Sequence, residues 1–149
     1  MGTHHQGTVA EVRALNTYIA LMRASRSTTA RVHGHLADTG LTLGQFAALE
    51  ALHHLGPMLQ TALAGKLLCS AGNLTVVLDN LEDRGLVSRG RVAEDRRCVR
   101  VRVSATGSRL IRRIFPRHVR ALVDDLAILS PREQETLRTL CRRLGRQAR

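Results

Sequence analysis

A chain of 149 residues with 44% hydrophobic residues is long enough for one domain with helical extensions. Its 23 basic residues outnumber its 12 acidic ones, and the formal net charge of +11 favours a polyanionic partner. No apolar run is long enough to cross a bilayer, no secretory pattern is present, and the three cysteines form no CxxC pair. We therefore expect a cytoplasmic protein that has no membrane partner, no metal site and no cofactor.

The first predicted helix covers residues 8–36. Thr8 and Glu11 have the spacing of a capping box, in which each side chain satisfies a backbone donor of the other residue. An apolar stripe at helical spacing follows, with Val12, Leu15, Ile19 and Met22. The stripe then becomes polar at Arg26, Thr29 and His33. Polar groups on a core-facing stripe need partners.

Three more helices are predicted before residue 86. Thr42 begins the first of them, which ends at Gly56 and carries Glu50 and His53 next to its apolar face. A short helix covers residues 60–68. Ser70 is a good N-cap for the third, and Gly85 is suited to end it.

The apolar period then changes from helical to two. Val99, Val101 and Val103 alternate with polar residues, which predicts a half-buried strand, and residues 86–92 are its expected partner. Six arginines crowd this small hairpin: Arg89, Arg91, Arg96, Arg97, Arg100 and Arg102. They repel one another unless a polyanion neutralises them. We expect Asp95 to pair with an arginine and to shape the tip.

Two helices complete the chain. A long one is predicted over residues 104–129 and contains Pro116. The last follows Ser130, Pro131 and Glu133, which form the clearest cap in the sequence, and its apolar face includes Leu137, Leu140, Cys141 and Leu144.

This order predicts a mainly α fold with a small β-hairpin wing, a winged helix-turn-helix flanked by N- and C-terminal dimerisation helices. The second helix of such a pair lies in the major groove, while arginine suits phosphate and a narrow minor groove. Asn pairs with adenine, and an apolar side chain meets a thymine methyl. The predicted DNA contacts are Ser70, Asn73, Thr75, Val76, Arg89, Arg91, Arg96, Arg97 and Arg100.

Several short motifs together resemble the DNA-binding core of the MarR (multiple antibiotic resistance regulator) family. They are the run from Ser70 to Thr75, the run from Leu78 to Val87, Asp95-Arg96-Arg97, and the run from Ser104 to Gly107. The flanking helices and the total length also fit the family. The sequence departs from it at Val76, where the family often has a basic residue.

The resemblance implies a homodimeric transcription regulator of double-stranded DNA, and a repressor that leaves a palindromic operator when a small phenolic or aromatic ligand binds. It divides the chain into an N-terminal dimerisation helix (1–40), a winged helix-turn-helix (41–104) and C-terminal dimerisation helices (105–149). The run at Gly72–Thr75, with Pro116 and His118, is most similar to members that sense phenols or quinones.

The polar positions Arg26, Thr29, His33, Glu50 and His53 are the candidate ligand contacts. They could instead pair with each other, with water or across the dimer. A second hypothesis is a thiol switch at Cys98, because neighbouring arginines lower a thiol pKa. A third is an architectural protein that binds DNA without sequence preference. We find no phosphate loop, nucleophile elbow or paired acids, so we do not expect an enzyme.

Overall fold

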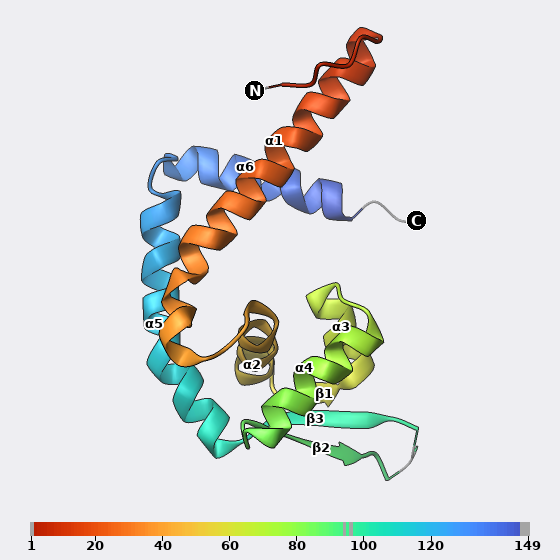
Figure 1. Ribbon diagram of the computed structural model, residues 1–149, viewed down its shortest axis with the longest axis vertical. Coiled ribbons are helices and arrows are strands. Elements are labelled where there is room, and N and C mark those ends of the chain that lie inside the picture. Colours follow the sequence, from red (N-terminus) through yellow and green to blue (C-terminus); the bar gives the residue numbers. More distant parts are fainter. Residues whose placement is uncertain (1, 94, 96, 147–149) are drawn as a thin grey trace. The chain divides into compact units, whose positions relative to one another are not determined.

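The computed structural model describes residues 2–93, 95 and 97–146. Along these residues the order is α1 (Val9–Val32), the 3-10 helix η1 (His33–Thr39), α2 (Leu43–Leu55), β1 (Met58–Leu59), α3 (Gln60–Leu67), α4 (Ala71–Asp83), β2 (Val87–Arg91), β3 (Val99–Val103), α5 (Ala105–Leu126) and α6 (Pro131–Gly145) (Figure 1). The chain forms two units. Unit 1 is Met1–Gly34 with Val119–Arg149, and unit 2 is His35–His118. Helix α5 therefore contributes to both.

The helices begin where their caps predict. Three capping boxes form, Thr8 with Glu11, Thr42 with Gln45 and Ser130 with Glu133. The end of the first helix differs from the prediction, because α1 stops at Val32 and the chain continues as η1 rather than as α-helix to Leu36. Gly34 lies at this change, and glycine weakens a helix interior. Leu36 is nevertheless buried.

Unit 2 has an aliphatic core, as the composition predicts. Leucines of α2, α3 and α4 meet side chains of the sheet and the first turns of α5. The fully buried members include Phe46, Leu49, Leu52, Leu63, Leu74, Leu78, Leu81, Val101 and Ile111. These residues hold α4 against the sheet and leave its opposite face exposed.

The sheet has one strand more than predicted. β2 and β3 pair antiparallel, with Val87 opposite Val103 and Arg91 opposite Val99. β1 pairs with the other side of β3, with Met58 opposite Val101, so the strand order is β1-β3-β2 (Figure 1). A strand of two residues has no alternation, and the sequence therefore did not predict it.

Helices α3 and α4 form the helix-turn-helix. The chain bends by 109° between them. Leu68 lies in this turn in the left-handed conformation, with φ of 51°, and its side chain is almost fully exposed. Gly85 ends the α4 segment with φ of 64°, a conformation that glycine adopts without a steric penalty.

The first turn of α5 packs very closely on the start of the hairpin. A Cβ atom at Gly107 would lie 2.1 Å from the carbonyl oxygen of Leu86, so only glycine fits. Ser104 begins the helix: its Oγ donates to the Gly85 carbonyl and accepts from the Gly107 N–H. The base of α5 is thereby fixed to the root of the hairpin.

Two imidazoles enter the core of unit 2. The ring centroids of His35 and His118 lie 5.3 Å apart, and that of Phe46 lies 4.7 Å from His118. His118 is only 6% exposed, and this burial was not predicted from the sequence. These histidines lie at the two positions where the chain passes between unit 2 and unit 1.

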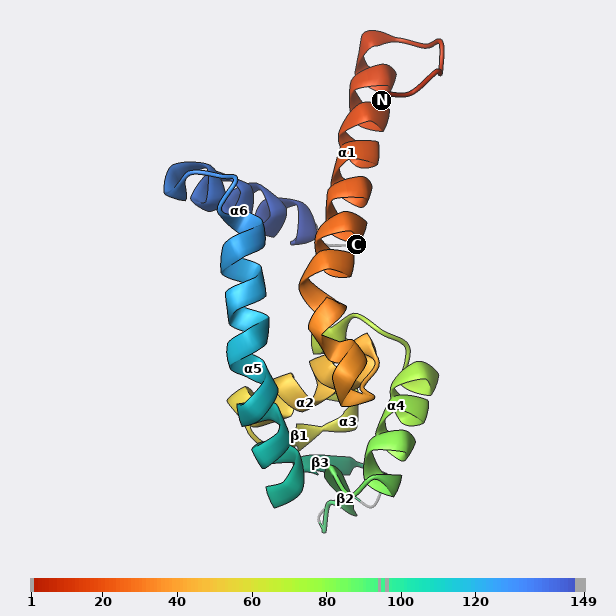
Figure 2. The same cartoon turned by 60° about the vertical axis from the view of Figure 1, so that its left-hand side comes forward.

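Unit 1 consists of α1, the last turns of α5 and α6, which turns away from the end of α5 (Figure 2). Arg31 of α1 forms an ion pair with Asp125 of α5, and the Gln134 amide donates to the Leu126 and Leu129 carbonyls. Among its described residues only Val32 is buried. Its large exposed apolar side chains are Val9, Leu15, Tyr18, Val119, Val123, Ile128, Leu137, Leu140 and Leu144.

Within the described part of the chain, no single helix has the length and apolar composition of a membrane span; only α3 and α4 taken together, across their bend, pass that criterion.

Candidate nucleic-acid interface

The N-terminal half of α4 presents an exposed polar surface. Ser70 caps the helix by accepting from the Asn73 N–H, which leaves the Asn73 side chain exposed on the first turn. Val76 follows one turn later and is 60% exposed, although it is apolar. The buried leucines on the opposite side of α4 fix this orientation. An amide and a methyl-bearing side chain thus lie on one accessible helix face.

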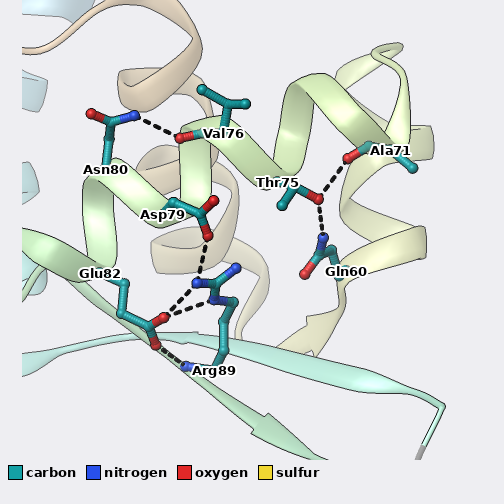
Figure 3. Close-up of polar contacts among 8 residues, drawn as sticks. All are labelled: Gln60, Ala71, Thr75, Val76, Asp79, Asn80, Glu82 and Arg89. Carbon is teal, nitrogen blue, oxygen red and sulfur yellow. Dashed lines mark hydrogen bonds and ion pairs between the residues drawn. The ribbon is translucent and has the colours of Figure 1, made fainter.

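Thr75 is held more firmly than its neighbours. Its hydroxyl donates to the Ala71 carbonyl at 2.9 Å and accepts from Gln60 Nε2 at 3.0 Å (Figure 3). Gln60 is the first residue of α3 and directly follows β1. The structure therefore places Thr75 on the side of α4 that faces α3.

Arg89 occupies the inner face of the hairpin. It lies opposite Val101 in the sheet and its side chain turns towards α4 (Figure 3). Its Nη2 lies 2.6 Å from Glu82 Oε2 and 2.7 Å from Asp79 Oδ1, and its backbone N–H donates to Glu82 Oε1. The hydrogen bond from Arg89 lowers the pKa of Glu82, and the same bond raises the pKa of Arg89. The arginine is thus already paired with two carboxylates.

Asp79, Glu82 and Gln60 were not among the predicted site residues. Two features of the sequence could have indicated the contact of Arg89 with Asp79 and Glu82. Asp79 and Glu82 are three residues apart on a helix of a strongly basic chain, and the period of two places Arg89 on the same face as buried Val87. No comparable signal marked Gln60, because its position depends on the unpredicted strand β1.

The hairpin tip is shaped by Asp95, as predicted. Its Oδ1 accepts from the Arg97 backbone N–H at 3.0 Å and from Arg97 Nε at 3.3 Å. These bonds lower the pKa of Asp95. The Arg97 side chain remains 92% exposed. Arg96 was also predicted to contact DNA, but it lies outside the described residues.

The other hairpin arginines point to two faces. Arg91 shares the inner face with Arg89, opposite Val99, but lies further along the strand and is exposed. Arg100 and Arg102 lie on the outer face, opposite Gly90 and Ser88. Among the residues that the structure describes, none of these three arginines has a carboxylate within ion-pair distance.

The chain that carries this capped, exposed helix start and basic hairpin resembles known proteins in sequence. The MarR family profile matches residues 41–99. The HTH-type transcriptional regulator MhqR of Bacillus subtilis is 31% identical over 137 residues, which cover 92% of this chain and 94% of MhqR.

The chain belongs to the MarR family. Solved structures agree in fold. Sco3205 of Streptomyces coelicolor, a MarR family transcriptional regulator in complex with DNA, superposes with a TM-score of 0.84 at 22% identity, over 99% of this chain and 94% of Sco3205. BpsR of Bordetella bronchiseptica, whose DNA binding is regulated by 6-hydroxynicotinic acid, gives a TM-score of 0.79 at 23% identity, over 87% of this chain and 98% of BpsR. This MarR-family chain is therefore a transcription regulator with a winged helix fold.

The pKa argument behind the predicted thiol switch at Cys98 does not hold, while the switch itself stays a prediction. Cys98 is half-buried, and its thiol donates to Asp95 Oδ2 at 3.6 Å. Burial raises the pKa of the Cys98 thiol, and the Asp95 carboxylate raises it further. The prediction of a lowered pKa was wrong, because it counted the neighbouring arginines in sequence but neither the burial of the sulfur nor the carboxylate that the tip brings to it.

The candidate ligand residues of this MarR-family chain fall into two sets. In unit 1, Arg26 is exposed in an open hollow of α1, while Thr29 and His33 are half-buried, with His33 Nδ1 2.9 Å from the Thr29 carbonyl oxygen. In unit 2, Glu50 and His53 are half-buried on α2. Burial, followed by the charges of His54 and Arg112, lowers the pKa of His53.

Proposed function

We propose that this chain is a homodimeric repressor that binds a roughly palindromic operator and releases it when a small aromatic anion binds. The observation that carries the DNA-binding part is the exposed first turns of α4, with Asn73 and Val76 on one face. A helix N-terminus attracts phosphate, and these two side chains suit an adenine edge and a thymine methyl. The helix therefore has the chemistry needed to select sequence.

The wing supplies affinity without selecting sequence. Arg91, Arg97 and Arg100 are exposed, and the only carboxylate near them in the described part of the chain is Asp95, at 3.3 Å from Arg97. Phosphate contacts release condensed counterions, so each one makes binding more sensitive to salt. We propose these residues, together with Ser70 and Arg96, as backbone contacts.

The apolar surface of unit 1 supports the dimer. Leu137, Leu140 and Leu144 recur at helical spacing on α6, and about half of each side chain is exposed. Exposed apolar stripes of this length mark interaction surfaces. An isologous dimer repeats every DNA contact about a twofold axis, which requires a roughly palindromic operator.

The proposed effector is a small aromatic anion. BpsR, which has the same fold, is regulated by 6-hydroxynicotinic acid. The two candidate sets are Arg26, Thr29 and His33 in unit 1 and, separately, Glu50 and His53 in unit 2. If either set binds the effector, Arg26→Ala or His53→Ala will weaken release by 6-hydroxynicotinic acid while leaving DNA affinity intact.

A footprint on the DNA upstream of the protein's own gene, at physiological salt with excess competitor, tests the DNA-binding part. A protected, roughly palindromic site is expected. Asn73→Ala should then reduce the preference for this site over a scrambled site, whereas Arg97→Ala should weaken binding to both and flatten the salt dependence. Equal affinity of the native protein for both sites would favour an architectural protein instead.

A further inference from the structure

Helix α4 receives side-chain contacts from Gln60, which directly follows the edge strand β1, and from Arg89 of the other edge strand, β2 (Figure 3). At the β1 edge, Gln60 donates to Thr75 at 3.0 Å, in the N-terminal half of the helix. At the β2 edge, Arg89 joins Asp79 and Glu82, in the C-terminal half. We call these the β1-edge contact and the β2-edge contact.

We propose that these two edge contacts hold the recognition helix and the wing in one fixed orientation, so that Thr75 and Arg89 are positioning residues rather than DNA contacts. This inference rests on the proposed function, because it concerns how the same surface meets DNA. It also changes the role that the sequence indicated for both residues.

The β2-edge contact is the stronger of the two. Asp79 and Glu82 lie one turn apart, so their charges repel each other, and both lie near the C-terminal end of α4, where negative charge is unfavourable. Arg89 forms an ion pair with each of them and offsets their repulsion, and its side chain is only 23% exposed. A guanidinium with two charged hydrogen-bond partners would have to give them up to reach a phosphate.

The same carboxylate also binds backbone. Glu82 Oε1 accepts from the Arg89 N–H at 2.9 Å, while Oε2 accepts from Nε at 2.9 Å. β2 is an edge strand, so this N–H has no strand partner on that side. The contact therefore fixes the strand itself, and not only its side chain, relative to α4.

The β1-edge contact orients the other half of the helix. The Thr75 hydroxyl uses its proton for the Ala71 carbonyl and a lone pair for Gln60. Gln60 follows Leu59, which pairs with Arg100 of β3. Both contacts therefore connect α4 to the central strand β3, one by way of β1 and the other by way of β2. A base pair that binds Thr75 would have to compete with both of its hydrogen bonds.

The sign of one substitution separates the two roles. Glu82→Gln removes a negative charge from the DNA-binding surface. If Arg89 is a phosphate contact, this change releases it and tightens operator binding. If Arg89 is a positioning residue, the change loosens the wing, and we expect binding at least about threefold weaker. The control is Asp83→Asn, an exposed carboxylate on the same helix without an ion pair among the described residues, which should not weaken binding.

The salt dependence gives a second readout, which the loss of a phosphate contact would change and the loss of a positioning residue would not. Arg89→Gln should lower affinity but leave the slope of log affinity against log salt unchanged. Arg91→Ala, on the same strand face but exposed, should reduce that slope by about one. Fluorescence anisotropy with a labelled operator measures both, and thermal unfolding shows that each variant is folded at the assay temperature.

The β1-edge contact is tested with altered operators. Thr75→Val and Gln60→Ala should each weaken binding to the operator and to single base-pair variants by the same factor, and the double substitution should cost no more than either one alone. Tighter or unchanged binding by Glu82→Gln, a reduced slope for Arg89→Gln, or lost discrimination at one base pair for Thr75→Val would overturn the inference. Absence of specific binding by the native protein would instead overturn the proposed function.

Discussion

The two units use similar aliphatic side chains in very different ways. Six leucines of unit 2, including Leu49 and Leu78, are less than 2% exposed, as are Val101 and Phe46. In unit 1 only Val32 is buried among the described residues, and α6 has no buried residue in its span. The burial differs because unit 2 packs three helices on a sheet, whereas each helix of unit 1 is covered by its neighbours on one side only.

Unit 2 is therefore stabilised by its own core, while the apolar surface of unit 1 stays exposed. We propose that a second copy covers this surface in the homodimer. Burial of apolar area is worth about 25 cal/mol per Å², and unit 1 gains little of it as it stands. Four substitutions test this contrast between the two units.

The largest effect is expected in the core of unit 2. Leu78→Ala leaves a cavity in a fully buried site, and we expect a loss of about 2–5 kcal/mol in the free energy of unfolding. Urea denaturation followed by circular dichroism measures it. The control is Leu68→Ala, at a side chain 93% exposed, where the change should stay within about 0.5 kcal/mol. Equal losses at both positions would contradict the assignment of the core.

The close approach at Gly107 gives the next largest effect. Gly107→Ala places a Cβ against the Leu86 carbonyl oxygen and should cost about 1–3 kcal/mol in unfolding free energy. Gly72→Ala is the matched control, because it lies in α4 with no atom within 4 Å of the added Cβ, and should stabilise by up to about 1 kcal/mol. The two changes should thus shift the melting temperature in opposite directions.

A charge on α6 tests the surface of unit 1. Leu140→Asp should weaken self-association by tenfold or more, which corresponds to about 1.4 kcal/mol, while the unfolding of unit 2 is unaffected. Thr139→Asp, on a different face of the same helix, serves as the control. Sedimentation equilibrium measures both, and an unchanged association constant for Leu140→Asp would exclude this face from the dimer.

The smallest effect concerns the Arg31–Asp125 ion pair within unit 1. The hydrogen bond from Arg31 holds the pKa of Asp125 below its ordinary value of 3.8. A lowered folded-state pKa contributes stability above the unfolded pKa, and this contribution is lost as the pH falls through the folded-state pKa. Asp125→Asn should therefore lower the urea midpoint slightly at pH 7 and not at a pH well below 3.8. The control is Asp124→Asn, at a neighbouring carboxylate that forms no ion pair among the described residues, which should leave the urea midpoint at pH 7 unchanged.

Local signals in the sequence predicted most of the fold. Ser70, Thr42 and Ser130 mark helix starts because a cap needs only residues three apart. The valine alternation marks β3 for the same reason. β1 was missed because its two residues form a strand only through their partner β3.

The candidate site was predicted less completely, because its chemistry depends on contacts across elements. Exposure of Asn73 and Val76 follows from the helical period of their own helix. The pairing of Arg89 and the raised pKa of Cys98 depend instead on Glu82 and Asp95, which only the folded chain brings to them. The charges along the sequence predict a uniformly basic hairpin. In the structure, carboxylates pair with Arg89, and the Asp95 carboxylate lies beside the Cys98 thiol.

The edges of the small sheet also bear on solubility. A sheet edge with exposed backbone groups can pair with the edge of another molecule and begin aggregation. Here one edge is the two-residue strand β1, which is too short to serve as a template, and on the other edge the Glu82 carboxylate occupies the Arg89 N–H. Loss of Glu82 would expose this donor at the edge of the sheet. Resistance to aggregation and the geometry of the wing thus depend on the same side chain.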